Sequence, residues 1–175
     1  WHADHLNFAK LLNLLEEQLG LFREGESPDY QLMLDIMYYM TRYADVLHHP
    51  KEDVVFARVK AREPALGAPI DDLTRQHARL REMGETMVRE LSDVLNGSIE
   101  PREQVERAAR RYVDAMRAHM RAEEATILPR AERLLSDRDW IEIDAAIANF
   151  DDPLFGSKEH DRYTRLRQQI DAERG

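Results

Sequence analysis

The segment from Val105 to Leu128, VERAARRYVDAMRAHMRAEEATIL, contains the pattern that decides the fold. Its apolar residues recur in steps of three and four, a spacing that keeps them on one face of an α-helix, the face that packs inward. His119 and Glu123 fall within this apolar seam. The seam comprises Val105, Ala109, Tyr112, Met116, His119, Glu123 and Ile127. The segment therefore predicts a long helix that carries an imidazole and a carboxylate into the core.

Histidines occupy the same kind of position elsewhere in the chain. His5 lies in one apolar seam and His77 lies in another. A further segment carries His48 and Glu52, and this separation of four places both side chains on one side of a helix. The two seams are His5, Phe8, Leu12, Leu15, Leu19 and Phe22, and Ile70, Leu73, His77, Leu80, Gly84, Met87, Leu91 and Val94.

The order of these residues repeats within the chain. His5 precedes His48 by 43 positions, and His77 precedes His119 by 42 positions. A shift of 71 or 72 positions superimposes the first set on the second. Each half therefore carries a lone histidine on one helix and a His-x-x-x-Glu motif on the next.

Buried imidazoles and carboxylates require a chemical reason. An unpaired buried carboxylate is too costly to keep charged, so it must be protonated, paired or bound to a metal. Four imidazoles and two carboxylates form a nitrogen and oxygen ligand set that suits iron and, less selectively, manganese or zinc. Two metals fit this set better than one, because two equal halves divide evenly into two imidazoles per metal with the glutamates as bridges. Such a centre keeps positions open for an exogenous oxygen species.

Glycine, proline and capping residues separate the periodic segments and predict an all-α fold. We expect an up-and-down four-helix bundle over about residues 2–135, with a C-terminal helical extension over about 136–175 in the same single domain, 1–175. The predicted helices cover about 2–23, 28–62 with an interruption at Pro50, 70–95, a segment from Ser98 to about 135, and 137–149. A loop at 151–156 and a C-terminal helix follow.

Composition narrows the functional classes. The chain contains no cysteine, which excludes disulfides, thiolate metal sites and cysteine nucleophiles. Its net charge of −9 argues against nucleic acid as a partner. No stretch approaches the roughly 20 apolar residues that cross a bilayer, so we expect no membrane insertion and a cytoplasmic location. Neither a His-Glu-x-x-His motif nor a Gly-rich phosphate loop occurs.

The residues resemble the hemerythrin-like, or HHE cation-binding, family over about residues 2–135. The resemblance depends on Asp4-His5, the segment His48-His49-Pro50-Lys51-Glu52-Asp53, Gln76-His77, and His119-Met120-Arg121-Ala122-Glu123-Glu124. It implies a four-helix bundle with a non-haem di-iron centre, whose two irons are bridged by carboxylates and by an oxo or hydroxo group. The implied iron ligands are His5, His48, Glu52, His77, His119 and Glu123. The loop at 151–156 also resembles bacterial members with a C-terminal extension.

One departure from the family pattern affects the expected function. Oxygen-carrying hemerythrins have a fifth histidine one turn from the position of His77, where this chain has Leu73 and Arg81. The set more closely resembles the members with four histidines and two glutamates that are linked to nitric oxide stress and iron-centre repair. Those repair proteins carry a cysteine-containing N-terminal segment that this chain lacks. The resemblance thus favours a stress-response role over reversible oxygen transport.

Three further residues are candidates near the centre. A regular helix points His49 about 100° away from His48, but Pro50 disfavours helical geometry there, so a kink would bring His49 in as an additional ligand or as a partner of the ligands. Tyr43 and Tyr112 are candidates for lining the pocket and donating to bound oxygen, with structural packing as the alternative.

Three functions remain open from the sequence. The first is a di-iron protein that binds or senses oxygen, nitric oxide or peroxide. The second is a di-iron enzyme that degrades peroxide as a catalase does. The third is a metal-free interaction bundle whose seam histidines form a polar network. A ferritin-like di-iron site is excluded, because no histidine has a glutamate three residues before it.

Overall fold

The computed structural model describes residues 2–98, 102–146, 152–156 and 161–172. Every regular element in these ranges is a helix, which confirms the all-α prediction for the described part of the chain. The elements are α1 (His2–Glu24), α2 (Tyr30–Tyr39), η1 (Met40–His48), α3 (His49–Arg62), η2 (Pro64–Leu66), α4 (Gly67–Leu95), α5 (Arg102–Thr126), α6 (Leu128–Leu134), α7 (Asp137–Ala146), η3 (Asp161–Tyr163) and α8 (Thr164–Ala172).

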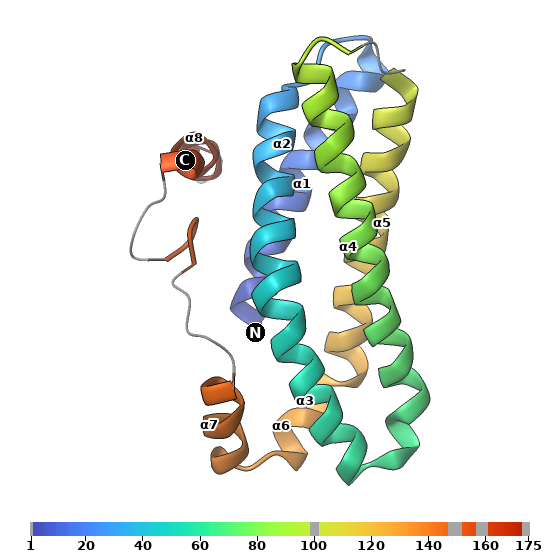
Figure 1. The fold of residues 1–175 in the computed structure, drawn as a ribbon, viewed down its shortest axis with the longest axis vertical. Helices are drawn as coiled ribbons and strands as arrows, with labels where there is room; N and C mark the ends of the chain where they lie inside the picture. The colour runs from blue at the N-terminus through green and yellow to red at the C-terminus, as the bar shows by residue number, and fades with distance from the viewer. Residues whose placement is uncertain (1, 99–101, 147–151, 157–160, 173–175) are drawn as a thin grey trace.

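The long helices lie side by side (Figure 1). α1 packs against α2 and α5, and α4 packs against the same two helices. η1 and α3 continue α2 without a break, and α6 packs against both α5 and α3. Of the C-terminal elements, α7 contacts α3 near one end of the long helices, and α8 contacts α2. Among the described residues, none of the helices combines the length and the apolar composition needed to span a bilayer.

Local sequence signals set most helix ends. Gly25 and Gly97 follow α1 and α4 with φ angles of 79° and 88°, a left-handed conformation that glycine adopts without strain. Ser136 precedes α7, and its hydroxyl accepts a hydrogen bond from the backbone N–H of Asp139. The predicted helix up to residue 135 is instead divided at Ile127, because Pro129 has no N–H to continue the hydrogen bonds of α5 and starts α6.

The helix before Pro50 differs from the prediction. No interruption occurs at Pro50, which lies in the first turn of α3, and the irregularity comes earlier as a π-helix over Met40–His48. The backbone N–H of His49 donates to the carbonyl of Ala44, five residues back. Gly84 of α4 faces this π-helix so closely that a Cβ atom there would lie 2.8 Å from Cγ2 of Thr41.

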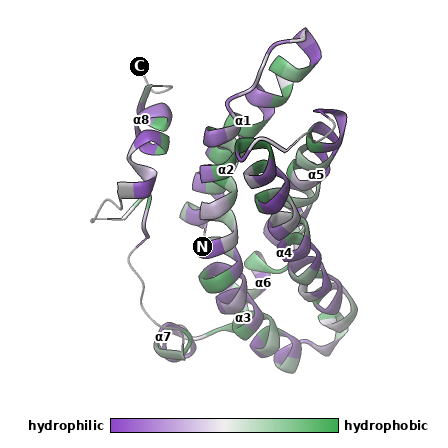
Figure 2. Ribbon diagram, turned by 45° about the horizontal axis from the view of Figure 1, so that its top comes forward, coloured by the Kyte–Doolittle hydropathy of each residue, from purple (hydrophilic) through white to green (hydrophobic). Residues whose placement is uncertain are grey.

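The apolar core consists of two clusters. The larger joins α1, α2, α4 and α5 with residues of the C-terminal elements, and the smaller joins α3, α4, α6 and α7. Along each long helix, hydrophobic residues alternate with hydrophilic ones (Figure 2). Phe8 of the larger cluster meets the ring of His48, and Phe56 of the smaller cluster stacks on His77. A buried polar layer therefore lies between the two clusters.

Candidate metal centre

The six side chains predicted as ligands meet in this polar layer. They come from α1 (His5), η1 (His48), α3 (Glu52), α4 (His77) and α5 (His119 and Glu123). All six are buried, and the most exposed of them, His48, exposes only 6% of its surface. Helices from separate parts of the sequence thus place these six side chains at one point in the interior.

The two glutamates lie at the middle of the group. Glu52 is 2.9 Å from Nε2 of His48 and 3.4 Å from Nε2 of both His5 and His77. Glu123 is 3.1 Å from Nε2 of His119, 3.4 Å from Nε2 of His77 and 3.5 Å from Nε2 of His5. Each carboxylate therefore contacts histidines from both halves of the chain, the arrangement that a bridging ligand requires.

The inward atoms fit a metal better than they fit one another. Nε2 of His48, His77 and His119 and both oxygens of Glu123 are fully buried, yet none has a partner in hydrogen-bond alignment. Buried polar atoms in native proteins are normally satisfied, so a group of such atoms at one point is suited to holding a metal ion. Imidazole nitrogens and carboxylate oxygens are a donor set that iron accepts.

The outward nitrogen of each histidine has its own acceptor. Hydrogen bonds to Nδ1 hold an imidazole in one orientation and assign its proton, which leaves Nε2 free to bind a metal. The four pairs are His5 with Glu124 (3.0 Å), His48 with Asp4 (2.9 Å), His77 with Asp53 (3.0 Å) and His119 with Gln76 (3.1 Å). All four rings are therefore oriented with Nε2 toward the glutamates.

The role of these four acceptors was not predicted from the sequence. Each is the direct neighbour of a predicted ligand: Asp4 precedes His5, Asp53 follows Glu52, Gln76 precedes His77 and Glu124 follows Glu123. The signal that could have revealed them is their repetition at equivalent positions in the two halves. A side chain next to an inward residue on a helix leaves the core at the side, where it can reach a histidine on the adjacent helix.

Proton occupancy of the centre follows from the same contacts. Burial favours the neutral form of His77, but the hydrogen bond to Asp53 and the nearby carboxylates of Glu123 and Glu52 raise its pKa to about 11. Burial also opposes the charge on Glu52, but the charge of His48 and the close approach of His48, His5 and His77 hold its pKa well below the usual value. Metal ions entering the centre must therefore displace protons from imidazoles.

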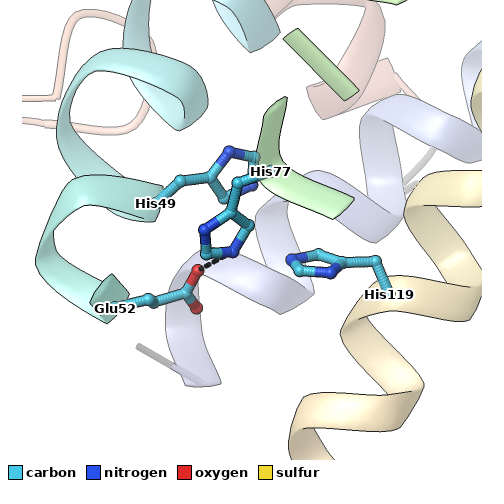
Figure 3. Close-up of side chains that lie close together, drawn as sticks. All are labelled: His49, Glu52, His77 and His119. Atoms are coloured by element: carbon cyan, nitrogen blue, oxygen red, sulfur yellow. Dashed lines mark ion pairs between the residues drawn. The ribbon is translucent and has the colours of Figure 1, made fainter. Parts of the chain in front are cut away.

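His49 joins the group as well. It exposes 2% of its surface, and one of its ring nitrogens lies within 4.8 Å of ligand atoms of Glu52, His77 and His119 (Figure 3). A second group with the same spacing consists of His5, His48 and Glu52. Burial, reinforced by the charge of His77, lowers the pKa of His49 well below its ordinary value, so this imidazole is neutral.

A π-helix lies directly before His49, where two consecutive histidines are both buried. On an α-helix their side chains diverge by about 100°, which is the basis of the prediction that only a kink brings His49 inward. The five-residue hydrogen bond from His49 to Ala44 shifts the register of the backbone just before Pro50. π-Helical segments are rare and occur frequently at functional sites. The sequence pattern alone did not reveal this shift.

The two tyrosines lie beside the centre at different depths. Tyr112 is buried, and its ring lies 3.5 Å from the position that a Cβ of Gly84 would take. Tyr43 stacks on Tyr39 and meets Phe8 edge-on, and Phe8 in turn meets His48. Neither tyrosine lines the two pockets described next, and a role at the bound ligand stays a prediction.

Among the pockets lined by the described residues, one near His48 and one near His5 reach the predicted ligands. One has a volume of about 240 Å³ and is lined by Asp4, His48, Lys51, Glu52, Trp140 and Asp144. The other has a volume of about 200 Å³ and includes His5, His2 and Glu124 in its wall. Trp140 and Asp144 belong to α7, and Lys51 forms an ion pair with Asp144 at 2.5 Å. The first pocket is therefore closed in part by the C-terminal extension.

Comparison with known proteins gives one match. Residues 1–131 match the family model described as "Hemerythrin HHE cation binding domain". No curated protein and no solved structure matches the chain. The matched range contains all seven buried side chains of the candidate centre and ends before α7.

Proposed function

Because the chain belongs to the hemerythrin HHE cation-binding domain family, we propose that its buried centre holds two iron ions that bind oxygen, nitric oxide or peroxide. The family model and the buried group of histidines and glutamates support a metal-binding protein. We further propose that two irons are bound and that their ligand is oxygen, nitric oxide or peroxide. A role in oxidative or nitrosative stress would follow from such a ligand.

The proposal includes a fold and a domain assignment. We take α1, the continuous α2–η1–α3 segment, α4 and α5 as the four helices of an up-and-down bundle, supported by their mutual packing. Residues 136–175 would form an extension of the same domain, supported by the contacts of α7 with α3 and of α8 with α2. A cytoplasmic location stays a prediction.

In the proposed centre, His5 and His48 would hold one iron and His77 and His119 would hold the other. Glu52 and Glu123 would be shared between the two, which is supported by the contacts of each carboxylate with histidines of both halves. The bound iron would supply redox chemistry and Lewis acidity. The chain itself orients the imidazoles through Asp4, Asp53, Gln76 and Glu124, and keeps bulk water away by packing Phe8 and Phe56 on either side.

The single observation that carries the proposal is the convergence of buried Nε2 atoms and carboxylate oxygens without aligned hydrogen-bond partners. A metal-free polar network would satisfy these atoms with one another, because leaving each buried donor or acceptor unsatisfied costs about 1–3 kcal/mol. Several such atoms in one place would be a large penalty for a bundle that needs no ion. The geometry thus favours the metal-binding hypothesis over the interaction bundle.

The test is optical spectroscopy of the iron-loaded protein. Oxidation should produce near-ultraviolet absorption of an oxo-bridged ferric pair, and adding oxygen or nitric oxide to the reduced protein without air should produce new bands. Unchanged spectra with oxygen, nitric oxide and peroxide would overturn the proposed ligand class. Release of oxygen from peroxide faster than with an equal amount of free iron would instead assign the peroxide-degrading activity.

Trp140 offers a test of the access route. The Trp140→Ala substitution removes the largest side chain from the wall of the 240 Å³ pocket without touching a predicted ligand. We expect the association rate of nitric oxide or azide with the iron-loaded protein to rise several-fold, since rates of this kind depend on how the approach is obstructed. Stopped-flow absorbance measures the rate, and the spectrum at saturation should stay that of the unsubstituted protein.

Ile141, an exposed neighbour on α7, provides the control for this substitution. Ile141→Ala should leave the association rate unchanged, because this side chain does not line the pocket. An equal rate in the Trp140→Ala variant would show that the ligand enters by another path.

A further inference from the structure

A buried pair, Asp45 and His49, lies beside the centre and is not among its six predicted ligands. Each residue exposes 2% of its surface. Oδ1 of Asp45 lies 3.0 Å from Nδ1 of His49, and a guanidinium N–H of Arg81 donates to the backbone carbonyl of Asp45 at 2.8 Å. Both carboxylate oxygens of Asp45 are fully buried without an aligned hydrogen-bond partner, so this placement of a carboxylate is costly to keep. An arrangement this costly calls for an explanation in terms of function.

His49 has a carboxylate oxygen as close to Nδ1 as the four predicted histidine ligands have their acceptors, although only those four make an aligned hydrogen bond there. In all five residues Nδ1 lies about 3 Å from an acidic or amide oxygen. In His49, as in His48, His77 and His119, the other nitrogen, Nε2, is buried and has no hydrogen-bond partner. An imidazole oriented by a carboxylate at Nδ1 with an open Nε2 is the arrangement that a metal-binding histidine usually shows.

The imidazole ring of His49 lies on the side of the centre that His77 and His119 form. His49 is stacked on His77 with ring centroids 4.3 Å apart and planes 9° apart, and it meets His119 edge-on at 5.5 Å. Figure 3 shows the three imidazoles gathered beside Glu52, which comes from the same helix as His49. His5 is absent from this group of ligand atoms within 4.8 Å.

The internal repeat shows that this pair is an addition to the symmetric ligand set. The shift of 71 positions that places His48 on His119 places Asp45 on Met116 and His49 on Met120. Both methionines are buried on α5. One half therefore has a polar Asp–His pair where the other half has apolar packing, and the π-helix occurs only in the half with the pair among the described residues.

We propose that His49 is a third imidazole for the metal held by His77 and His119, with Asp45 as its positioning residue. This inference rests on the proposed function, because it requires two metals in the centre. The two metal sites are then unequal: one has three imidazoles and the other has two. Without His49 the ligand set would be symmetric.

The test compares His49→Met with the unsubstituted protein, since methionine is the residue that the other half carries at this position. In ⁵⁷Fe-loaded, oxidised protein, Mössbauer spectra should show two quadrupole doublets of equal area for the unsubstituted chain. The His49→Met variant should show the two doublets converging. The iron that His77 and His119 hold should also bind to this variant at least roughly 10-fold less tightly than to the unsubstituted protein. Even residues that only contact a metal ligand typically contribute 10–100-fold to metal affinity.

Asp45→Asn serves as a second test of the proposal, and Met120→Leu serves as its control. Asp45→Asn keeps the volume but removes the negative charge, and a smaller change in the same doublet is expected; this variant also answers the question if His49→Met fails to fold. Met120→Leu should change neither doublet. If the chain binds two irons and neither His49→Met nor Asp45→Asn changes the spectrum, the role of His49 is overturned while the proposed function stands. If the chain binds no iron, the proposed function itself is overturned.

Discussion

Replacing Glu123 with glutamine is expected to remove most of the bound iron. Glu123 is fully buried and lies within 3.5 Å of Nε2 of three predicted ligands, His5, His77 and His119. Glutamine keeps the volume of the side chain but cannot bridge two cations through a pair of anionic oxygens. We expect iron affinity to fall by roughly 100-fold or more, beyond the 10–100-fold that partners of metal ligands contribute. Metal analysis after gel filtration measures the iron retained per chain.

Asp114 is the matched control for this substitution. It lies on the same helix, α5, but is exposed, so Asp114→Asn removes one negative charge without reaching the interior. This variant should retain the iron content of the unsubstituted protein. Equal iron contents in the Glu123→Gln and Asp114→Asn variants would contradict the assignment of Glu123 as a ligand.

Removing the metal should produce the largest change in stability. A ligand that binds only the folded state at 1,000 times its dissociation constant contributes about 4.1 kcal/mol. For a chain of this size about 1 kcal/mol shifts the melting temperature by ≈ 2–4 °C, so chelation of the iron should lower the melting temperature by about 10 °C. Without metal this contribution is lost, and buried carboxylates and imidazoles within 3.5 Å of one another depend on protons for their charge balance.

Thermal unfolding followed by circular dichroism measures this difference. Adding ferrous iron without air should restore the melting temperature, whereas magnesium should not, because magnesium favours an octahedral set of oxygen ligands. In the Glu123→Gln variant, added iron should raise the melting temperature much less. A melting temperature that is equal with and without chelator would mean that the fold does not depend on a bound ion.

The ligand positions could be predicted because they break an otherwise regular pattern. His77 and His119 replace apolar residues in seams whose other members are buried in the structure, such as Leu80 and Met116, except for the half-buried Val94. Helical periodicity is a local property, so one sequence is enough to read which face of a helix is inward. The repeat then shows that the two halves contribute equivalent side chains. The family match over residues 1–131 agrees with that reading.

The orientation of the ligands could not be predicted in the same way. The hydrogen bond that His5 donates to Glu124 joins residues 119 positions apart, and the hydrogen bond that His77 donates to Asp53 also connects two helices. Such contacts depend on the rotation of each helix about its axis and on the shift of neighbouring helices along their axes. Periodicity fixes neither quantity, although the repeated positions of the acceptors were visible in the sequence.

The π-helix limited the prediction for His49. A pattern read with 3.6 residues per turn places His48 inward and His49 to the side. The extra residue in the turns before His49 lies in the π-helix that Gly84 of α4 approaches closely at Thr41, a contact between helices that helical periodicity does not reveal. Pro50 marked the right place in the chain, but the predicted interruption there was wrong.

The most direct test of the central claim is a crystal structure of the iron-loaded protein with anomalous diffraction data collected at the iron absorption edge. We predict two anomalous peaks in the interior between the helices, both next to Glu52 and Glu123. His5 and His48 should lie at one peak, and His77 and His119 at the other. An interior without anomalous density, or iron found only on the surface, would contradict the account.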